Sequence, residues 1–272
     1  MNNESKKTKN MKETKKSNEN IKKINYDPEK INTIYLEYSI ENENENEIRL
    51  LGDNFVYQNK NKCEMIINNE KYNLNSVINL NDYNINKTQK LFSIILKTTF
   101  ITNMSMMFYD CKNLIKADFS LFDSKTVENV ERMFAKCVNL INVNLNCFKT
   151  ENVKNMGYMF AYCYSLTAID LSSFNTENVI TMKEMFYWCN NLIKLDLSNF
   201  NTKNVTDMKW MFSYCKNLAY IDLSSFNLEN VLIMDYMFTD CKKITNLKIN
   251  RKSFNKFKNE ILFDYPFIIE LI

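Results

Sequence analysis

The chain has 272 residues, of which 45% are apolar and 25% are charged, so it carries enough apolar material for one or two domains with a buried core. It has only 2 Gly and 2 Pro, no glycine-rich phosphate loop and no histidine. This composition excludes the common nucleotide-binding loops, Ser-His-Asp and Cys-His catalysis, and zinc sites that use histidine.

The net charge is +3, from 35 basic and 32 acidic side chains. Residues 1–30 hold nine Lys against five acids and few apolar residues, so we expect a disordered basic tail there. The rest of the chain is nearly neutral, which does not favour binding to nucleic acid or to a membrane surface.

The sequence shows no apolar stretch near the eighteen or so residues that a transmembrane helix requires. Its first residues, Met1-Asn-Asn-Glu-Ser, lack the apolar core of a signal peptide. We therefore expect a cytoplasmic protein, with a cell-surface location by an unrecognised route as the alternative.

Residues 31–100 form the next region, and their alternating apolar residues predict a β-rich N-terminal cap. The expected strands are Ile34–Tyr38, Glu47–Leu51, Met65–Ile67, Tyr72–Leu74 and Leu91–Leu96. The same region contains the acids and the thiol that an enzyme would need, namely Asp53, Glu64, Glu70, Asp82 and Cys63. Their spacing pairs no two carboxylates and gives the thiol no base, so an enzyme built on this region is the weakest of three functional hypotheses.

From residue 101 to 250 the chain is a repeat array. The segment Met-Phe-x-x-Cys occurs six times at a constant spacing of 26 residues, with its cysteines at Cys111, Cys137, Cys163, Cys189, Cys215 and Cys241. Three, six and eight residues after each cysteine stand apolar residues, and a phenylalanine follows at eleven in five of the six units. A period of 20–29 residues is typical of leucine-rich repeats.

Each unit contains two patterns. Leu166–Ser172 alternates apolar and polar residues and predicts a short strand, whereas Val179–Cys189 spaces its apolar residues by three and four and predicts a short helical turn. Stacking such units gives a right-handed α/β solenoid of six 26-residue coils with one continuous core. Residues 251–272 are apolar at irregular spacing, and we expect a C-terminal cap on the last coil.

The consensus Cys-x-x-Leu-x-x-Ile-Asp-Leu-Ser-x-Phe-Asn-Thr-x-Asn-Val-x-x-Met-x-x-Met-Phe resembles the BspA-like leucine-rich repeat family, the Treponema-type repeat. That repeat occurs in surface proteins of bacteria and protists and in mycoplasma lipoproteins of unassigned function. The resemblance covers residues 101–249 and implies a repeat scaffold for protein binding or adhesion. It implies no catalytic residues, no cofactor and no metal.

The six periodic cysteines would stack in a row about 5 Å apart, which cannot form a tetrahedral metal site. We therefore expect reduced thiols buried in the core, with Cys63 and Cys147, which break the period, as the accessible ones.

Seven residues after each cysteine lies a mostly acidic column on the polar side of the strands: Asp118, Asn144, Asp170, Asp196, Asp222 and Lys248. The neighbouring column varies: Lys116, Asn142, Ala168, Lys194, Tyr220 and Asn246. Both would line the concave face, where solenoids commonly bind partners. The acids could bind a partner that carries basic residues. Alternatively, they could accept hydrogen bonds from local donors and recur only because the unit was duplicated. Specificity would then come from the varying column.

Two further columns are polar and aromatic. We expect the asparagines Asn152, Asn178, Asn204 and Asn230 to adopt left-handed backbone and to bond neighbouring coils. Just before the cysteines stand Tyr162, Trp188 and Tyr214, with Tyr158 and Trp210 nearby. These rings could anchor a partner or simply pack on one another.

The sequence thus favours a non-enzymatic scaffold that binds a partner protein through the solenoid surface, with a surface adhesin as the alternative. The candidate partner-binding residues are Asp118, Asp170, Asp196, Asp222, Lys116, Lys194, Tyr220, Tyr162, Trp188 and Tyr214.

Overall fold

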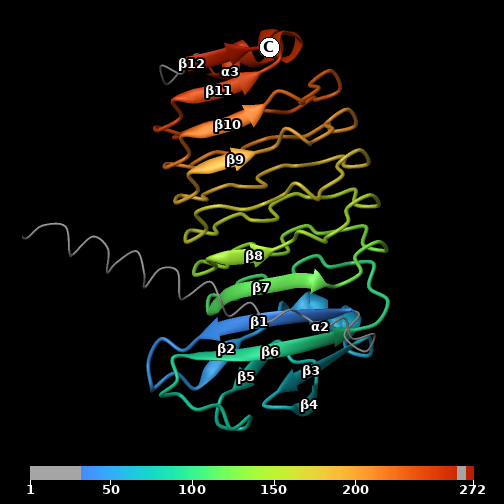
Figure 1. The fold of residues 1–272 in the computed structure, drawn as a ribbon, viewed down its shortest axis with the longest axis vertical. Coiled ribbons are helices and arrows are strands. Elements are labelled where there is room, and N and C mark those ends of the chain that lie inside the picture. Colours follow the sequence, from blue (N-terminus) through green and yellow to red (C-terminus); the bar gives the residue numbers. More distant parts are fainter. Residues whose placement is uncertain (1–31, 262–267) are drawn as a thin grey trace, which may run out of the picture. The chain divides into compact units, whose positions relative to one another are not determined.

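A computed structural model describes residues 32–261 and 268–272 of the chain. The expected basic tail therefore lies outside the described residues. Residues 32–272 form one compact unit, in which the coils follow one another from β7 to β11 (Figure 1).

The region before the repeats consists of six strands and one helix. They are β1 (Thr33–Ser39), β2 (Glu47–Arg49), α2 (Asp53–Asn59), β3 (Cys63–Ile67), β4 (Glu70–Asn73), β5 (Val77–Asn79) and β6 (Leu91–Thr98). Strands lie at all five places where the sequence predicts them, whereas α2 and β5 are additional. Alternation explains the strands, since Ile34, Leu36 and Tyr38 of β1 are buried and the residues between them are half exposed.

This region is joined to the first coil by a continuous sheet of order β4-β3-β6-β1-β7-β8. β1 pairs antiparallel with β6 on one side and with β7 (Leu114–Leu121) on the other. A close backbone contact strengthens this seam, because the Gly52 amide donates to the Met107 carbonyl at 2.8 Å. A Cβ on Gly52 would lie 2.0 Å from the Met106 carbonyl oxygen, so only glycine fits there.

The strands of the coils pair in parallel. They are β7, β8 (Asn142–Asn144), β9 (Lys194–Asp196), β10 (Tyr220–Leu223) and β11 (Asn246–Ile249), and β12 (Ile268–Leu271) adds a final parallel strand to β11. The strand expected within Leu166–Ser172 is absent, so this prediction is wrong for the third coil. Ala168 is the smallest residue of its column and offers its neighbours little cross-strand packing.

The predicted solenoid is confirmed, but its second side is not helical. The turn segments, which run from the valine or isoleucine to the cysteine of each unit (101–111, 127–137, 153–163, 179–189, 205–215 and 231–241), consist of successive β-turns. Alternate amides donate to the next coil, as Met106 N–H does to Glu131 O at 2.8 Å and Phe108 N–H to Met133 O at 2.8 Å. In an α-helix these amides would form hydrogen bonds within one coil, whereas here they bond the next coil and hold neighbouring coils together.

Two residues in each turn segment have left-handed backbone. In the fourth coil they are Glu184 and Trp188, with φ of 54° and 61°. Each stands third in a β-turn, the position that requires positive φ in a type II turn. The prediction that Asn152, Asn178, Asn204 and Asn230 supply the left-handed residues is therefore wrong.

The core of the coils is built from two columns of phenylalanine. Phe134, Phe160 and Phe186 are fully buried and stack nearly parallel, with ring centroids 5.5 and 5.7 Å apart. A second column, from Phe122 to Phe200, stacks beside the strands at 6.1–6.4 Å. Because each ring packs on the next, one coil cannot bury its own apolar face.

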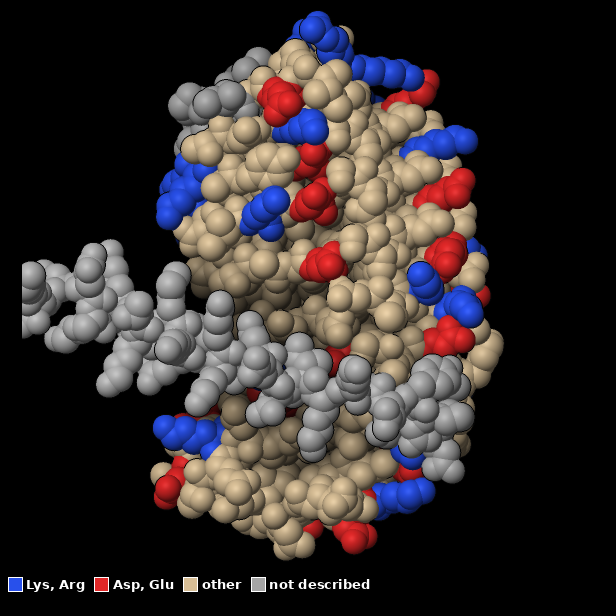
Figure 2. Space-filling view, viewed as in Figure 1, with Lys and Arg blue, Asp and Glu red and all other residues tan. Residues whose placement is uncertain are grey.

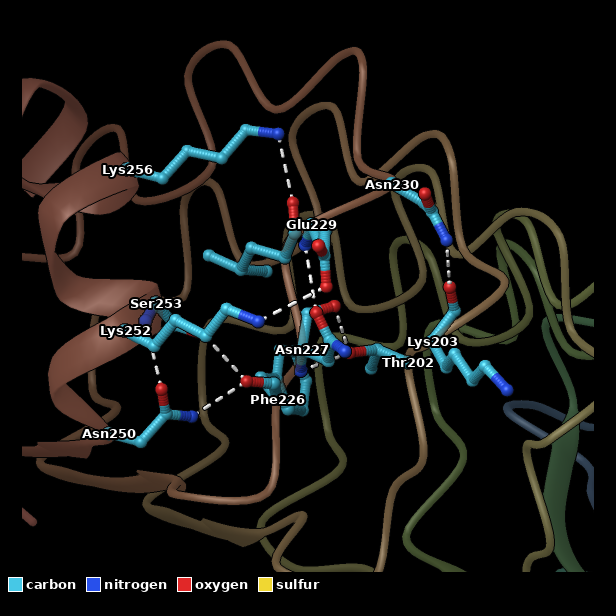
Figure 3. Close-up of polar contacts among 11 residues, drawn as sticks. Thr202, Lys203, Phe226, Asn227, Glu229, Asn230, Asn250, Lys252, Ser253 and Lys256 are labelled. Atoms are coloured by element: carbon cyan, nitrogen blue, oxygen red, sulfur yellow. Dashed lines mark hydrogen bonds and ion pairs between the residues drawn. The ribbon is translucent and has the colours of Figure 1, made fainter.

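Polar side chains satisfy the backbone between coils. The Cys163 thiol donates to Phe134 O at 3.2 Å, and the same contact recurs for Cys137, Cys189, Cys215 and Cys241. The Asn230 amide donates to Lys203 O at 2.7 Å, as Figure 3 shows, and the other three asparagines of its column make the equivalent bond. The expected asparagine bonds between coils are therefore present.

The last coil is followed by α3 (Arg251–Ile261). Phe257 of α3 is buried and lies 5.9 Å from Phe238, the last ring of the first phenylalanine column. Ser253 and Asn250 donate to Phe226 O at 2.6 and 2.7 Å (Figure 3). The end of the core therefore has a covering helix. Within the described ranges, no helix is long and apolar enough to cross a membrane.

Candidate interaction surfaces

The polar sides of the two main sheets form one surface, which we call the strand face. It comprises the side chains of β4, β3, β6, β1, β7 and β8, of the third coil at residues 168–170, and of β9 to β12 that point away from the core. Figure 2 shows acidic side chains in a row on this face over β9 and β10.

The acidic column lies on the strand face, and its aspartates accept hydrogen bonds from the backbone two residues further on. Asp118, Asp170 and Asp196 each accept the amide of the serine two residues later, at 2.8–3.0 Å. The hydrogen bonds from Ser172 hold the pKa of Asp170 below its ordinary value. Asp170 and Asp196 remain exposed, so a partner could reach them.

Asp222 differs from the other acids because it is only 6% exposed and already has a cation. Lys248 lies 3.3 Å from its carboxylate, and the Ser224 amide donates to it at 2.9 Å. Burial alone would raise the pKa of Asp222, but the Ser224 hydrogen bonds and Lys248 outweigh it and lower the pKa. Asp222 is therefore tied into the fold.

The varying column lies beside the acids and is hollowed at its middle. A groove is lined by Lys116, Asn142 and Ala168 of this column together with Asp118, Asn144 and Asp170. It lies where the sheet is interrupted at the third coil. Lys116 pairs with Glu37 of β1 at 2.8 Å, and Lys194 lies 5.4 Å from the ring of Tyr220.

The aromatic residues gather on the turn segments. Trp188 stacks on Tyr214 with ring centroids 4.5 Å apart, whereas Tyr162 contacts Tyr187 at 5.3 Å. Trp210 joins them by stacking on Tyr187 at 5.9 Å. The predicted column of three is thus a wider cluster in which Tyr187, which the sequence pattern did not single out, holds the central place.

The thiols offer little chemistry. All eight cysteines are free, and the six periodic ones are buried. Burial raises the pKa of the Cys189 thiol to about 12. Cys147 is exposed as expected. The prediction of an accessible Cys63 is wrong, because Cys63 is the first residue of β3 and its side chain is buried on the core side. Across the described residues, no three Cys, Asp or Glu side chains gather in a group that could hold a metal ion.

The fold and these surfaces define a repeat-solenoid protein with an interrupted parallel sheet on one side. The chain matches the family model described as "Mycoplasma protein of unknown function, DUF285" over residues 53–192 and 163–261. These matches span more than half of the chain, which therefore belongs to that family. No curated protein matches it.

A crystal structure of a leucine-rich repeat protein from Bacteroides ovatus ATCC 8483 is similar, with a TM-score of 0.43 and 20% sequence identity. The similarity covers 62% of this chain and 39% of that one, so this chain spans well under half of its length. The match to the mycoplasma family supports the resemblance to BspA-like repeats at the level of the repeat family. Neither match is to an enzyme family.

Sequence reasoning missed the part of the strand face that lies before the repeats. Tyr35, Glu37 and Lys97 point to the same side as the acidic column, because β1 lies between β6 and β7. Alternation within 33–39 and 91–98 signals two-sided strands. It does not show which side joins the solenoid, because that depends on pairing between distant segments.

Proposed function

We propose that the protein is a non-enzymatic recognition scaffold that binds a partner protein through the strand face. The proposal assigns no catalytic residue and no cofactor. The observation that supports it is the pair of exposed carboxylates, Asp170 and Asp196, beside a column whose residues change from coil to coil.

The fold does not need the charge of these acids. Asn144 occupies the same column and accepts the amide of Asn146 at 3.2 Å, which is the bond that the aspartates make. An uncharged amide therefore suffices for the turn, while aspartates in adjacent coils repel each other. The extra negative charge is better explained by contact with a partner that carries positive charge.

A protein is the partner that fits this surface. Carboxylates repel nucleic-acid phosphates, whereas lysine and arginine side chains of a protein complement them. The varying residues beside them, such as Lys116, Lys194 and Tyr220, would supply the specificity that a repeated acid cannot.

The experiment is affinity capture from source-cell lysate with the wild-type chain and with Asp170→Lys plus Asp196→Lys. The matched control reverses two exposed acids at another edge of the coils, Glu151→Lys plus Glu177→Lys. We expect the same partner to be retained by wild type and control and lost by the strand-face variant. Retention by both variants would contradict the proposal.

The aromatic cluster is a second candidate surface, because its rings are not required by the backbone. The left-handed positions that hold Tyr158, Tyr162 and Trp188 hold Arg132 and Lys136 in the second coil. Clustered Tyr and Trp are common anchors of interfaces. If Trp188→Ala lowers only the stability and leaves capture intact, the cluster is packing alone.

A further inference from the structure

We propose that the region before the repeats is part of the binding surface, and that a basic groove on it holds an acidic segment of the same partner. This inference rests on the proposed function and extends it. It gives the partner segment a charge pattern: acidic over the first strands, apolar in the middle and basic over the coils.

The strand face is continuous across the seam between the two regions. Cross-strand register places one residue from each of the six strands in a row on this side of the sheet: Lys71, Ile66, Ile95, Tyr35, Asp118 and Asn144. Directly opposed residues of neighbouring strands lie on the same side of a sheet. A segment bound over the coils can therefore continue onto β1, β6 and β3.

The basic groove lies beside the β4, β3 and β6 members of this row, where Lys97 of β6 stands opposite Glu64 of β3. Its lining includes Lys60, Lys62, Lys71 and Lys97, and one acid, Glu64. Glu64 pairs with Lys71 at 3.2 Å. None of the other three lysines forms an ion pair with a residue of the described ranges, so their charge is available to an anionic partner.

The middle of the row is apolar. Ile66, Ile95 and Tyr35 are half exposed, whereas the residues on either side of each of them in its strand are buried on the core side. The unpaired lysines border this apolar middle along β3 and β6, and Asp118, Asp170 and Asp196 lie beyond its other end. Charge complementarity therefore favours one extended segment with opposite charges at its two ends.

The dimensions fix the length of that segment. Five strand spacings separate β3 from the third coil, a distance of about 24 Å at roughly 4.8 Å per spacing. An extended chain covers this distance with about seven residues. A peptide of four glutamates, a seven-residue Val/Ser spacer and four lysines would therefore match the surface.

The test measures binding of this labelled peptide by fluorescence anisotropy at low salt, against a peptide of the same composition with glutamates and lysines alternating. We call the first peptide, in which glutamates and lysines form separate blocks, the block peptide. We expect it to bind more tightly than the peptide in which they alternate. Lys60→Gln, Lys62→Gln and Lys97→Gln together should weaken it about tenfold, since each surface ion pair contributes little alone. The control, Lys125→Gln, Lys149→Gln and Lys203→Gln, removes three exposed lysines elsewhere and should leave affinity unchanged.

Unchanged affinity in the groove variant, with its unfolding temperature preserved, would overturn the inference. So would inorganic phosphate binding as tightly as the peptide, because the groove would then be a general anion site. Asp170→Asn plus Asp196→Asn separates the two proposals. If this variant keeps full affinity while the groove variant loses it, the groove stands and the acidic column fails.

Discussion

The region before the repeats and the coils build the same strand face by different means. In the coils, position in the repeat decides contact: the Cys163 thiol reaches the carbonyl of the coil before, and Phe160 lies between the rings of its neighbours. In the first region, β1 lies between β6 and β7, far from either in the chain. Local repetition therefore stabilises the coils, whereas a long-range seam attaches the first region.

This difference predicts which part of the fold a substitution destabilises. A change inside the coils removes contacts with two neighbours and weakens the array on both sides, because solenoid stability is a sum of coil and interface contributions. A change at the seam should instead separate the first region from intact coils. The following predictions test that distinction.

The largest effect should come from Phe160→Ala. The ring is fully buried between Phe134 and Phe186, so its loss leaves a cavity that spans two interfaces between coils. We expect about 3–5 kcal/mol of lost unfolding free energy in a denaturant titration. Ile193→Ala, at a 55% exposed position, is the control and should change the value by less than about 0.5 kcal/mol.

Gly52→Ala should weaken the seam. The added methyl group would meet the backbone oxygen of Met106 at 2.0 Å, which cannot move away without shifting the first coil. We expect a loss of about 1–3 kcal/mol, with faster hydrogen exchange in β1 and β6 and little change in the later coils.

Gly157→Ala is the matched control for the seam. Its nearest neighbour would be the Asn155 side-chain oxygen at 3.1 Å, which is not backbone and needs to yield by only a few tenths of an ångström. Equal destabilisation by the two alanines would show that the seam has no special role.

Cys163→Ala removes a buried thiol that donates to Phe134 O, and should lower the free energy of unfolding by about 1–2 kcal/mol in a denaturant titration.

The burial of the periodic thiols should also protect them from reagents. Native protein titrated with a thiol reagent at pH 8 should show one reactive cysteine, Cys147, and denatured protein should show eight. Two or more reactive thiols in the native protein would contradict the burial.

The smallest effect concerns Asp222 and Lys248. The pKa of Asp222 is lowered in the fold, so its ionised form stabilises the last coils above its unfolded pKa of about 3.9. That contribution is lost as the pH falls below this value and through the folded pKa. Asp222→Asn should therefore reduce the loss of unfolding free energy between about pH 4 and lower pH. An unchanged pH dependence in this range would contradict the ion pair.

The repeat predicted most of the coils because each core position recurs at a fixed distance from a cysteine. The repeat did not predict the backbone conformation where contacts between coils, rather than the spacing of apolar residues, determine it. The spacing in Val179–Cys189 suits a helical turn equally well. Glu184 and Trp188 are instead left-handed, and their own amides donate to the next coil rather than within a helix. Tyr35 and Lys97 could not be placed on the strand face from the sequence, because β6 pairs with β1 and β1 joins the coils only through its long-range pairing with β7.

The most direct test of a continuous strand face is a hydrogen-exchange footprint of the block peptide on the wild-type chain. We expect protection in β3 and β6 and in the second to fourth coils near residues 142–146, 168–172 and 194–198. Protection confined to the turn segments around Trp188 and Tyr214 would contradict it and would make the aromatic cluster the binding surface.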